Sequence, residues 1–255
     1  RQEEILKSLQ KIGSVQVEAL AQQWRVTTQT VRRDLAELCE TGLAMRTHGG
    51  AKRINTKAVV AYEDRRLKNT LAKRSVAEAA ADLIPHGASL MLNIGTTTEM
   101  VAEALRLHNG LTVISNNINV VQILKASRVK SLVLIGGEIR LSDCAVIGED
   151  AIKSISNFKV DFAVIGASSI DTDGSILDFD QREVSVSRSI LENARKKILV
   201  ADVSKFAVPA LFKICNAKEL DYVILNELPP SGFKDILKGE ATQLIISKDK
   251  NAILN

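Results

Sequence analysis

Short apolar segments alternate with helical patterns through the last two thirds of this 255-residue chain, and no other feature constrains the fold as strongly. Segments rich in Val, Ile and Leu, each followed by a helical pattern, are typical of parallel strands joined by crossover helices. We therefore predict an α/β domain with a mostly parallel sheet that helices cover on both faces. The predicted strands are 88–95, 111–117, 131–137, 161–169, 197–204, 222–226 and 243–247, and the predicted helices are 97–107, 118–127, 149–157 and 181–195.

Polar residues follow most of these predicted strands. The carboxyl ends of parallel strands meet at one edge of a sheet, and ligands of α/β proteins bind there. A small phosphorylated polyol would suit this edge, with its anion at Lys205 or Arg140 and its hydroxyls at Asp202, Glu183 or Asn116. The candidate effector-binding residues are Gly95, Thr96, Thr97, Thr98, Glu99, Asn116, Asn117, Arg140, Gly166, Ser168, Asp171, Glu183, Asp202 and Lys205.

The segment from Gly95 to Glu99 is the best candidate for the phosphate itself. A glycine turn that leads into a helix presents free backbone N–H groups and the positive end of the helix dipole, and three threonine hydroxyls add donors. The same segment has the T-x-x-E spacing of a capping box between Thr96 and Glu99. The two interpretations are compatible, and both are kept.

A helix-turn-helix is predicted upstream of the α/β region. Helical spacing predicts helices over 3–12 and 16–24, and a third helix that Thr27 or Thr28 caps and Gly42 ends. In the third helix, Val31, Leu35 and Leu38 form one apolar stripe, while the opposite side carries Gln and Arg. Such an outer face suits the major groove, where Arg pairs with guanine and Gln with adenine.

A basic hairpin is predicted directly after the third helix, over 43–54. Gly49-Gly50 favours a tight turn, because positive φ costs glycine little. In this position the hairpin is typical of the wing of a winged helix, whose cations follow phosphates or enter a minor groove. The candidate DNA-binding residues are Thr28, Gln29, Thr30, Arg32 and Arg33 in the helix, and Arg46, His48, Lys52 and Arg53 in the hairpin.

The charge distribution supports this division. Residues 1–75 carry 15 Lys/Arg against 8 Asp/Glu, a net charge of +7, whereas residues 76–255 carry 19 against 22, a net charge of −3. A basic module joined to a mildly acidic body is typical of a nucleic-acid-binding protein. We expect a winged helix-turn-helix domain over 1–54, a charge-rich linker over 55–70 and an α/β sensor domain over 71–255. Within the last of these, the first expected element is a helix over about 72–84.

Cysteine and histidine usage argues against a metal or disulfide framework. The three cysteines form no CxxC pair, and the three histidines are far apart. We expect no metal and no cofactor, and we expect a cytoplasmic protein. No apolar run approaches the roughly 18 residues of a membrane span, so no membrane partner is expected.

The chain resembles the DeoR family of bacterial transcriptional repressors over nearly its whole length. The N-terminal resemblance lies in VTTQTVRRDLAEL (26–38) and RTHGGA (46–51). The body carries NIGTTTE (93–99), SNNINV (115–120), GGEIR (136–140), DFAVIGASSID (161–171), FDQREV (179–184) and ADVSKF (201–206). The longer runs 171–184 and 190–206 resemble most the subgroup that responds to glycerol 3-phosphate.

This resemblance implies several properties. The body would have the fold of ribose-5-phosphate isomerase and coenzyme A transferases, with the GTTT turn (95–98) as its phosphate site and Asp202 and Lys205 facing the effector. The protein would be a homodimer or homotetramer on repeated or inverted operator sites of double-stranded DNA. A phosphorylated sugar or polyol, such as glycerol 3-phosphate, would release it from the operator of a carbon-catabolic operon.

An enzyme is the main alternative, because the same sheet supports sugar-phosphate isomerases and acyl transferases, and a fold does not settle a function. Asp171, Glu183, Asp202 and Lys205 have side chains that can move protons. The sequence offers no clear nucleophile–base pair, so we expect a regulator rather than an enzyme. An architectural DNA binder without a ligand leaves some 180 residues of α/β domain unexplained.

Overall fold

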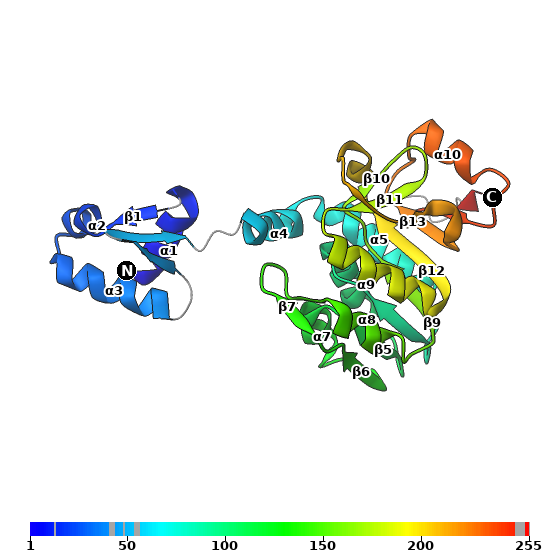
Figure 1. The fold of residues 1–255 in the computed structure, drawn as a ribbon, viewed down its shortest axis with the longest axis horizontal. Helices are drawn as coiled ribbons and strands as arrows, with labels where there is room; N and C mark the ends of the chain where they lie inside the picture. Colours follow the sequence, from blue (N-terminus) through cyan, green and yellow to red (C-terminus); the bar gives the residue numbers. More distant parts are fainter. Residues whose placement is uncertain (13, 41–43, 48, 54–56, 248–252, 255) are drawn as a thin grey trace. The chain divides into compact units, whose positions relative to one another are not determined.

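The structure is a computed structural model that describes residues 1–12, 14–40, 44–47, 49–53, 57–247 and 253–254. Contacts divide the chain into two compact units, Arg1–Ala61 and Tyr62–Asn255 (Figure 1). Each unit is described by itself.

The N-terminal unit is a winged helix, as predicted. It contains α1 (Gln2–Ile12), α2 (Val17–Trp24) and α3 (Thr28–Glu40), with β1 (Ser14–Gln16), β2 (Ala44–Thr47) and β3 (Gly50–Arg53) in the antiparallel order β1-β3-β2. The hairpin β2–β3 confirms the predicted wing, whereas β1 was not predicted. The predicted stripe of α3 is buried in the core of this unit: Val31, Leu35 and Leu38 are at most 4% exposed.

Two local features fix this unit. Thr27 caps α3, because its Oγ1 accepts a hydrogen bond from the Thr30 N–H at 3.2 Å. Gly50 pairs with Gln16 where β3 meets β1, and a Cβ at this glycine would lie only 1.9 Å from the carbonyl oxygen of Val15. The wing sheet therefore requires glycine at position 50.

Two helices connect the wing to the sheet of the second unit. The predicted linker contains α4 (Lys57–Leu67), a helix that the sequence pattern did not predict. The predicted helix over 72–84 is α5 (Thr70–Asp82). Asn69 stands between them with φ 56° and ψ 34°, a left-handed conformation that Asn adopts more readily than most residues. The connection is therefore a helical corner.

The second unit is built on an eight-stranded sheet in the order β16-β15-β14-β12-β9-β4-β5-β6. Every neighbouring pair is parallel except β15–β16, so the predicted mostly parallel sheet is confirmed. The strands are β4 (Ser89–Leu92), β5 (Thr112–Ser115), β6 (Ser131–Leu134), β9 (Val160–Ile165), β12 (Ala194–Ala201), β14 (Tyr222–Leu225), β15 (Gln243–Ile246) and β16 (Ile253–Leu254).

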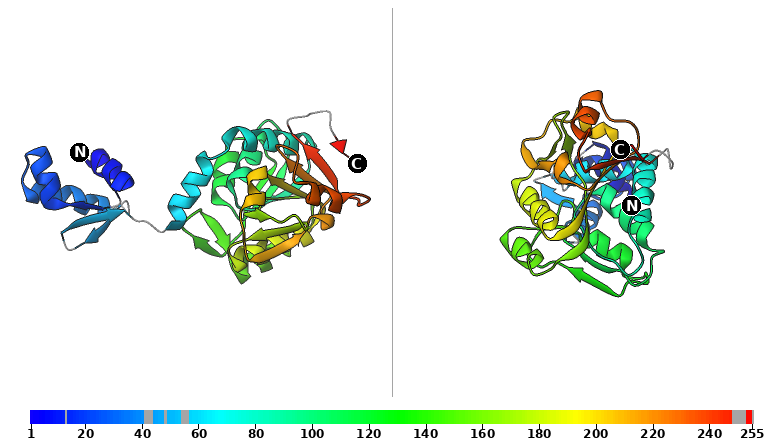
Figure 2. Two further views of the ribbon diagram at one scale, coloured as in Figure 1. Left: turned by 90° about the horizontal axis from the view of Figure 1, so that it is seen from above. Right: turned by 90° about the vertical axis from the view of Figure 1, so that its right-hand side faces the viewer.

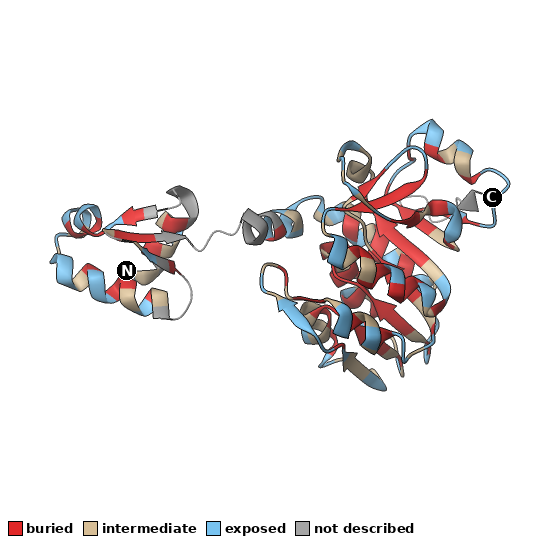
Figure 3. Cartoon of the chain, viewed as in Figure 1, coloured by how far each residue is buried: buried red, intermediate tan, exposed pale blue. Residues whose placement is uncertain are grey.

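Helices cover both faces of this sheet (Figures 1 and 2). One face packs against α5, α6 (Thr96–Leu105) and α7 (Ile118–Leu124), and the other against α8 (Glu149–Ile155), α9 (Gln181–Glu192) and α10 (Ser231–Leu237). In β4, Leu90 and Leu92 belong to the first core and Met91 to the second. The central strands are therefore buried on both faces, as Figure 3 shows, whereas the edge strand β6 has no buried residue, and burial on both faces explains why the central strands are almost continuously apolar.

The order of strands reverses between β4 and β9. From β4 the chain proceeds outward through β5 and β6, and it then returns to β9 on the other side of β4 before reaching β12 and β14. The carboxyl ends of β4 and β9 thus form the kind of switch point at which doubly wound sheets bind ligands. The amide of Asn93 accepts a hydrogen bond from the Gly166 N–H at 3.0 Å and joins these two ends.

Short antiparallel elements surround this edge, and the sequence did not predict them. They are the hairpin β7 (Glu138–Arg140)–β8 (Ala145–Ile147) and a three-stranded sheet of β10 (Ser169–Ile170), β11 (Ser175–Asp178) and β13 (Phe212–Asn216). The predicted strands 161–169 and 197–204 end earlier, at Ile165 and Ala201. None of the described helices is long and apolar enough to cross a bilayer.

Candidate functional site

The outer face of α3 and the start of the wing form one polar, cationic surface. Arg32, Arg33 and Arg46 are exposed, and the Arg33 side chain is 84% exposed although Glu37 lies 3.8 Å away. A hollow of about 890 Å³ is lined by residues from both elements. We call these predicted residues the reading face: Gln29, Thr30, Arg32, Arg33 and Arg46.

The other predicted DNA-binding residues are only partly described. Thr28 is exposed at the first residue of α3. Lys52 and Arg53 lie on β3, paired with Met45 and Ala44, but their side chains are outside the described part of the chain. His48 also lies outside the described residues.

A pocket of about 150 Å³ lies in the second unit, between the corner of α4 and α5 and the turn that follows β12. Four of its side chains are basic and one is acidic, so it suits an anion. We call it the cation pocket, and its lining is Arg65, Lys68, Asn69, Lys73, Ser168, Phe179, Asp202, Ser204, Lys205 and Val208.

The single carboxylate of this pocket is already engaged. Asp202 is 2% exposed and accepts hydrogen bonds from Asn69 Nδ2 at 3.0 Å, from the Ser204 N–H at 3.1 Å and from the Ser204 hydroxyl. It caps the short 3-10 helix Val203–Ala207 that carries Lys205. Asp202 therefore caps the turn that carries Lys205, and its role as a ligand of effector hydroxyls stays a prediction.

Burial affects the charge of two lysines of the cation pocket. Burial lowers the pKa of Lys73 to about 8, and the nearby charge of Lys205 adds to this effect. Burial also lowers the pKa of Lys205; Asp202 opposes that shift, and Arg65 reinforces it. An anion in the pocket would stabilise the charged form of both lysines.

The predicted phosphate turn is packed more tightly than expected. Thr96, Thr97, Thr98 and Glu99 are all buried. The helix α6 begins at Thr96, so its N-cap is Gly95, with φ 139°, and among the described residues no side chain caps it. The predicted capping box between Thr96 and Glu99 is therefore wrong.

The threonines of this turn divide into two kinds. The hydroxyl of Thr98 donates to the carbonyl oxygens of Asn93 and Gly95, at 2.9 and 2.8 Å, and so holds the turn closed. Within the described part of the chain, the hydroxyls of Thr96 and Thr97 make no hydrogen bond, and neither is a fully enclosed atom. These two hydroxyls remain available to a ligand.

Glu99 is fixed by a buried network rather than open to a ligand. Its carboxylate accepts hydrogen bonds from the Tyr62 hydroxyl at 2.7 and 2.8 Å, from Asn117 Nδ2 at 3.1 Å and from Asn119 Nδ2 at 3.0 Å. Asn119 Nδ2 also lies 2.8 Å from the Tyr62 oxygen, which accepts from it. Asn117, another predicted ligand, is therefore part of the same network.

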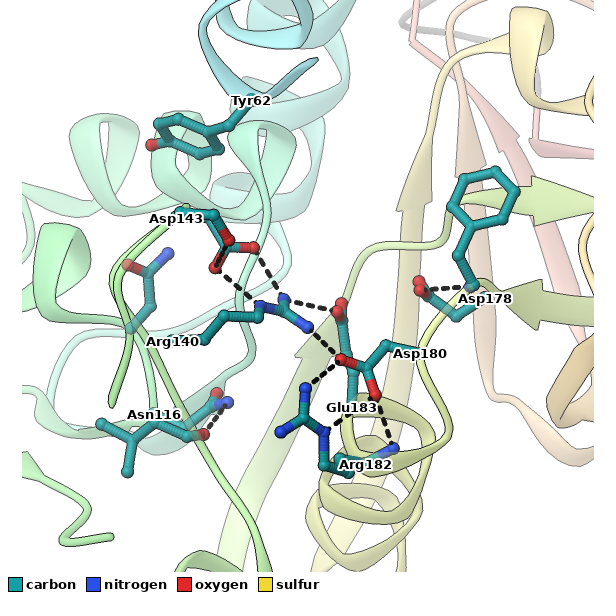
Figure 4. Close-up of polar contacts among 12 residues, drawn as sticks. Tyr62, Asn116, Arg140, Asp143, Asp178, Asp180, Arg182 and Glu183 are labelled. Carbon is teal, nitrogen blue, oxygen red and sulfur yellow. Dashed lines mark hydrogen bonds and ion pairs between the residues drawn. The ribbon is translucent and has the colours of Figure 1, made fainter. Parts of the chain in front are cut away.

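Arg140 and Glu183 form a separate group, the Arg140 cluster, with Asp143 and Asp180 (Figure 4). The Arg140 guanidinium donates to Asp143 at 2.9 and 2.7 Å, to Asp180 at 2.8 Å and to Glu183 at 2.7 Å. Its side chain is 18% exposed, and it does not line the cation pocket. Burial and the charge of Asp178 raise the pKa of Glu183, against the opposing effect of Arg140. Arg140 is therefore bonded to acidic side chains of this chain, and its role as an anion ligand stays a prediction.

The remaining predicted residues are dispersed. Ser168 lines the cation pocket, and Gly166 lies beside Thr98 at the switch point. Asn116 is 1% exposed; its Nδ2 donates to the Val146 carbonyl at 3.0 Å, and among the described residues its Oδ1 has no partner. Asp171 is exposed in the loop between β10 and β11.

The sequence analysis missed Arg65, Lys68 and Lys73, which supply three of the four cations of the pocket. These residues precede the first strand of the sheet, whereas the predicted ligands were residues that follow strands. The spacing of Arg65 and Lys68 could have indicated a cationic surface, since residues three apart lie on one face of a helix. Across the described ranges, no group of three or more His, Cys, Asp or Glu residues could hold a metal ion.

Comparison with known proteins matches both units to one family. Residues 1–57 match the DeoR-like helix-turn-helix domain, and residues 68–227 match the DeoR C-terminal sensor domain. The glycerol-3-phosphate regulon repressor of Haemophilus influenzae is 38% identical over 250 residues, which cover 98% of this chain and 97% of that protein. The repressor of the same name from Escherichia coli K12 is 38% identical over 240 residues, 94% of this chain and 95% of that protein.

Among solved structures, ribose 5-phosphate isomerase A from Neisseria gonorrhoeae aligns with 52% of each chain, at 17% identity and a TM-score of 0.37. The sequence matches span both units. The chain belongs to the DeoR family of transcriptional repressors.

Proposed function

We propose that this repressor binds operator DNA of a carbon-catabolic operon and is released when glycerol 3-phosphate occupies the cation pocket. The observation that carries the proposal is the charge of that pocket: four basic side chains face one carboxylate, and the carboxylate already has three donors. The repressors named for the glycerol-3-phosphate regulon, at 38% identity, support this choice of effector.

The DNA side of the proposal rests on the reading face. Gln29, Arg32 and Arg33 project from the exposed side of a helix whose opposite side is core. This is the arrangement in which a recognition helix enters the major groove and side chains pair with base edges. Arg46 of the wing would then lie along the phosphates.

The effector side rests on the match between a phosphate monoester and the pocket. At neutral pH such a group carries about 1.5 to 2 negative charges and three strong acceptor oxygens. These oxygens suit Lys73, Lys205 and Arg65, and the small volume favours a short polyol over a nucleotide. The hydroxyls of Thr96 and Thr97 at the first turn of α6 offer an alternative position for the phosphate.

Release requires that the effector bind the arrangement with low DNA affinity more tightly than the arrangement with high DNA affinity. Couplings between two sites are typically about 1–3 kcal/mol, or roughly 5- to 150-fold in affinity. The predicted homodimer or homotetramer stays a prediction, and the mass of the protein in solution would test it.

The test measures binding of the full chain to promoter fragments at fixed salt, because affinity for DNA depends steeply on salt. Glycerol 3-phosphate and several sugar phosphates are added one at a time. We expect Lys205→Ala to bind DNA as the parent protein does and to lose effector-dependent release. The matched control is Lys130→Ala, since Lys130 is exposed and outside the pocket. Release that persists in Lys205→Ala would remove Lys205 from the site.

A further inference from the structure

The corner between α4 and α5 supplies most of the charge of the cation pocket. Arg65 lies on α4, Lys68 lies in the corner, and Lys73 lies in the second turn of α5. The fourth cation, Lys205, comes from the turn after β12. A ligand in the pocket would therefore contact two parts of the chain that are far apart in sequence.

A few polar contacts hold this corner. Asn69 Nδ2 donates to Asp202 at 3.0 Å and to the Ser204 hydroxyl at 3.1 Å. The ammonium of Lys73 donates to the backbone carbonyl of Arg65, which links α5 to α4. An anion that attracts Lys73, Arg65 and Lys68 would compete with these contacts and change how the corner is held.

A second attachment lies one turn earlier on α4. Tyr62 is 7% exposed, and its hydroxyl bonds both carboxylate oxygens of Glu99. Glu99 lies in the first turn of α6, directly after the strand β4 at the switch point. Burial and the bond to Glu99 raise the pKa of Tyr62, so its hydroxyl stays protonated and remains a donor.

The helix α4 contains the boundary between the two units of the chain. Its residues from Tyr62 onward belong to the second unit, whereas Lys57–Ala61 belong to the N-terminal unit. Only residues 54–56 separate it from the last strand of the wing. Every covalent link from the cation pocket to the wing therefore passes through α4.

We infer that α4 and the corner that follows it read the effector: Arg65 of α4 and Lys68 of the corner bind the anion, and the Tyr62–Glu99 contact fixes the arrangement of α4 through which binding weakens DNA binding. The inference rests on the proposed function and deepens it. It assigns anion-binding residues outside the strand ends, and it assigns Tyr62 as a positioning residue that does not touch the effector.

The first test titrates glycerol 3-phosphate into the full-length variants Arg65→Gln and Lys68→Gln by calorimetry. Removing one charge-assisted contact should weaken binding by about 10- to 100-fold. The matched controls are Arg66→Gln on α4 and Arg74→Gln on α5, whose parent residues are exposed and do not line the pocket. The controls should stay within about 3-fold of the parent protein.

The outcomes separate the inference from the proposed function. If the parent protein binds neither glycerol 3-phosphate nor any sugar phosphate tried, the proposed function and the inference both fail. If the parent protein binds and is released from DNA, but Arg65→Gln and Lys68→Gln bind like the controls, the proposed function stands and the inference is overturned.

The second test examines Tyr62→Phe, which removes one hydroxyl and keeps the buried ring. We expect the Kd of this variant for glycerol 3-phosphate to stay within about 3-fold of the parent value. The ratio of its DNA affinity without effector to its DNA affinity with effector should differ from the parent ratio by at least about 5-fold, which is within the usual range of coupling. The chain's other tyrosine gives the control, Tyr222→Phe, because no partner of its hydroxyl is found among the described residues.

Thermal melting of both tyrosine variants confirms that they are folded at the assay temperature. A ratio of DNA affinities that is the same in Tyr62→Phe, Tyr222→Phe and the parent protein would exclude Tyr62 from the coupling. A parallel loss of effector affinity and release in Tyr62→Phe would mean that Tyr62 shapes the pocket instead, which also overturns its assigned role.

Discussion

The reading face and the cation pocket use the same residue types in different environments: the cations of the reading face are exposed, whereas in the pocket Lys73 is buried, Arg65 and Lys205 are half-buried and only Lys68 is exposed. On α3, the arginines are exposed, and their charges are fully solvated until a duplex displaces water and counterions. Around the pocket, burial lowers the pKa of two lysines, and one engaged carboxylate faces four cations. Exposed cations suit a long polyanion whose charge extends over many contacts, whereas buried ones select one small anion of the right charge.

The Arg140 cluster shows a third environment for a cation, in which the protein itself supplies the acidic partners. Its arginine has a side chain that is 18% exposed, and the guanidinium donates to three acidic side chains of this chain. A buried cation therefore indicates a ligand site only when the protein has not supplied the anion itself.

The largest expected effect is on stability. In Arg140→Met, Asp143 and Glu183 lose the guanidinium that bonds them, whereas Asp180 keeps Arg182 at 3.1 Å, so we expect the second unit to lose about 3–5 kcal/mol. The chain's single tryptophan, Trp24, lies in the N-terminal unit. In urea, the circular dichroism transition should move to lower concentration, while the Trp24 fluorescence transition should remain where it is.

The control for this prediction is Arg195→Met, which removes an exposed arginine that lies 3.5 Å from Asp161. Exposed ion pairs contribute about 0–1 kcal/mol. Equal, small losses in both variants would show that the carboxylates of the Arg140 cluster do not require Arg140.

A smaller effect is expected on the reading face. Arg33→Ala should weaken operator binding by about 1–3 kcal/mol at particular bases, whereas Arg53→Ala should weaken binding to all sequences alike. Competition between operator and random duplexes at fixed salt measures both. Equal losses for Arg33→Ala on the two duplexes would place Arg33 on phosphates instead of bases.

The smallest effect is on the pH dependence of effector binding. The lowered pKa of Lys73, about 8, means that this lysine loses its charge as the pH rises through 8, and a bound anion would raise that pKa again. Binding then takes up a proton above pH 8, so effector affinity should fall by up to about 10-fold per pH unit there. Calorimetry at pH 7.5 and 9 measures this fall.

The matched variant for the pH prediction is Lys73→Gln, which should bind more weakly at pH 7.5 and show a flatter profile. Below about pH 6 the phosphate monoester itself loses its second charge, so affinity should decrease there in both proteins. An alkaline fall of the same size in Lys73→Gln would assign the titration to another group.

Much of the fold follows from sequence patterns because its parallel strands are buried on both faces. Leu90-Met91-Leu92 alternates between two cores, so the whole segment is apolar and easily recognised. The hairpin β7–β8 and the sheet of β10, β11 and β13 have strands of two to five residues with mixed polarity, which loops share. The helix α4 lies in a charge-rich segment, and its attachment depends on the tertiary contact of Tyr62 with Glu99.

The site residues could be predicted from the sequence to a smaller extent than the fold. Strand-end reasoning indicated Lys205 and Ser168, which the structure brings into one pocket. It could not indicate Arg65 or Lys68, because no strand precedes them. It also could not indicate the ion pairs of Arg140, since two of its partners, Asp180 and Glu183, follow about forty residues later in the chain.

The placement of cations on the corner of α4 and α5 has a genetic consequence. Alleles that damage the reading face should leave the operon switched on, and an intact copy of the gene should restore control. Alleles that replace Arg65, Lys68 or Lys205 should give a repressor that stays bound to the operator whether or not the effector is present. In a mixed oligomer, such subunits should be dominant over the normal subunits. A screen for such uninducible, dominant alleles should therefore find changes just upstream of the first sheet strand as well as within the sensor body.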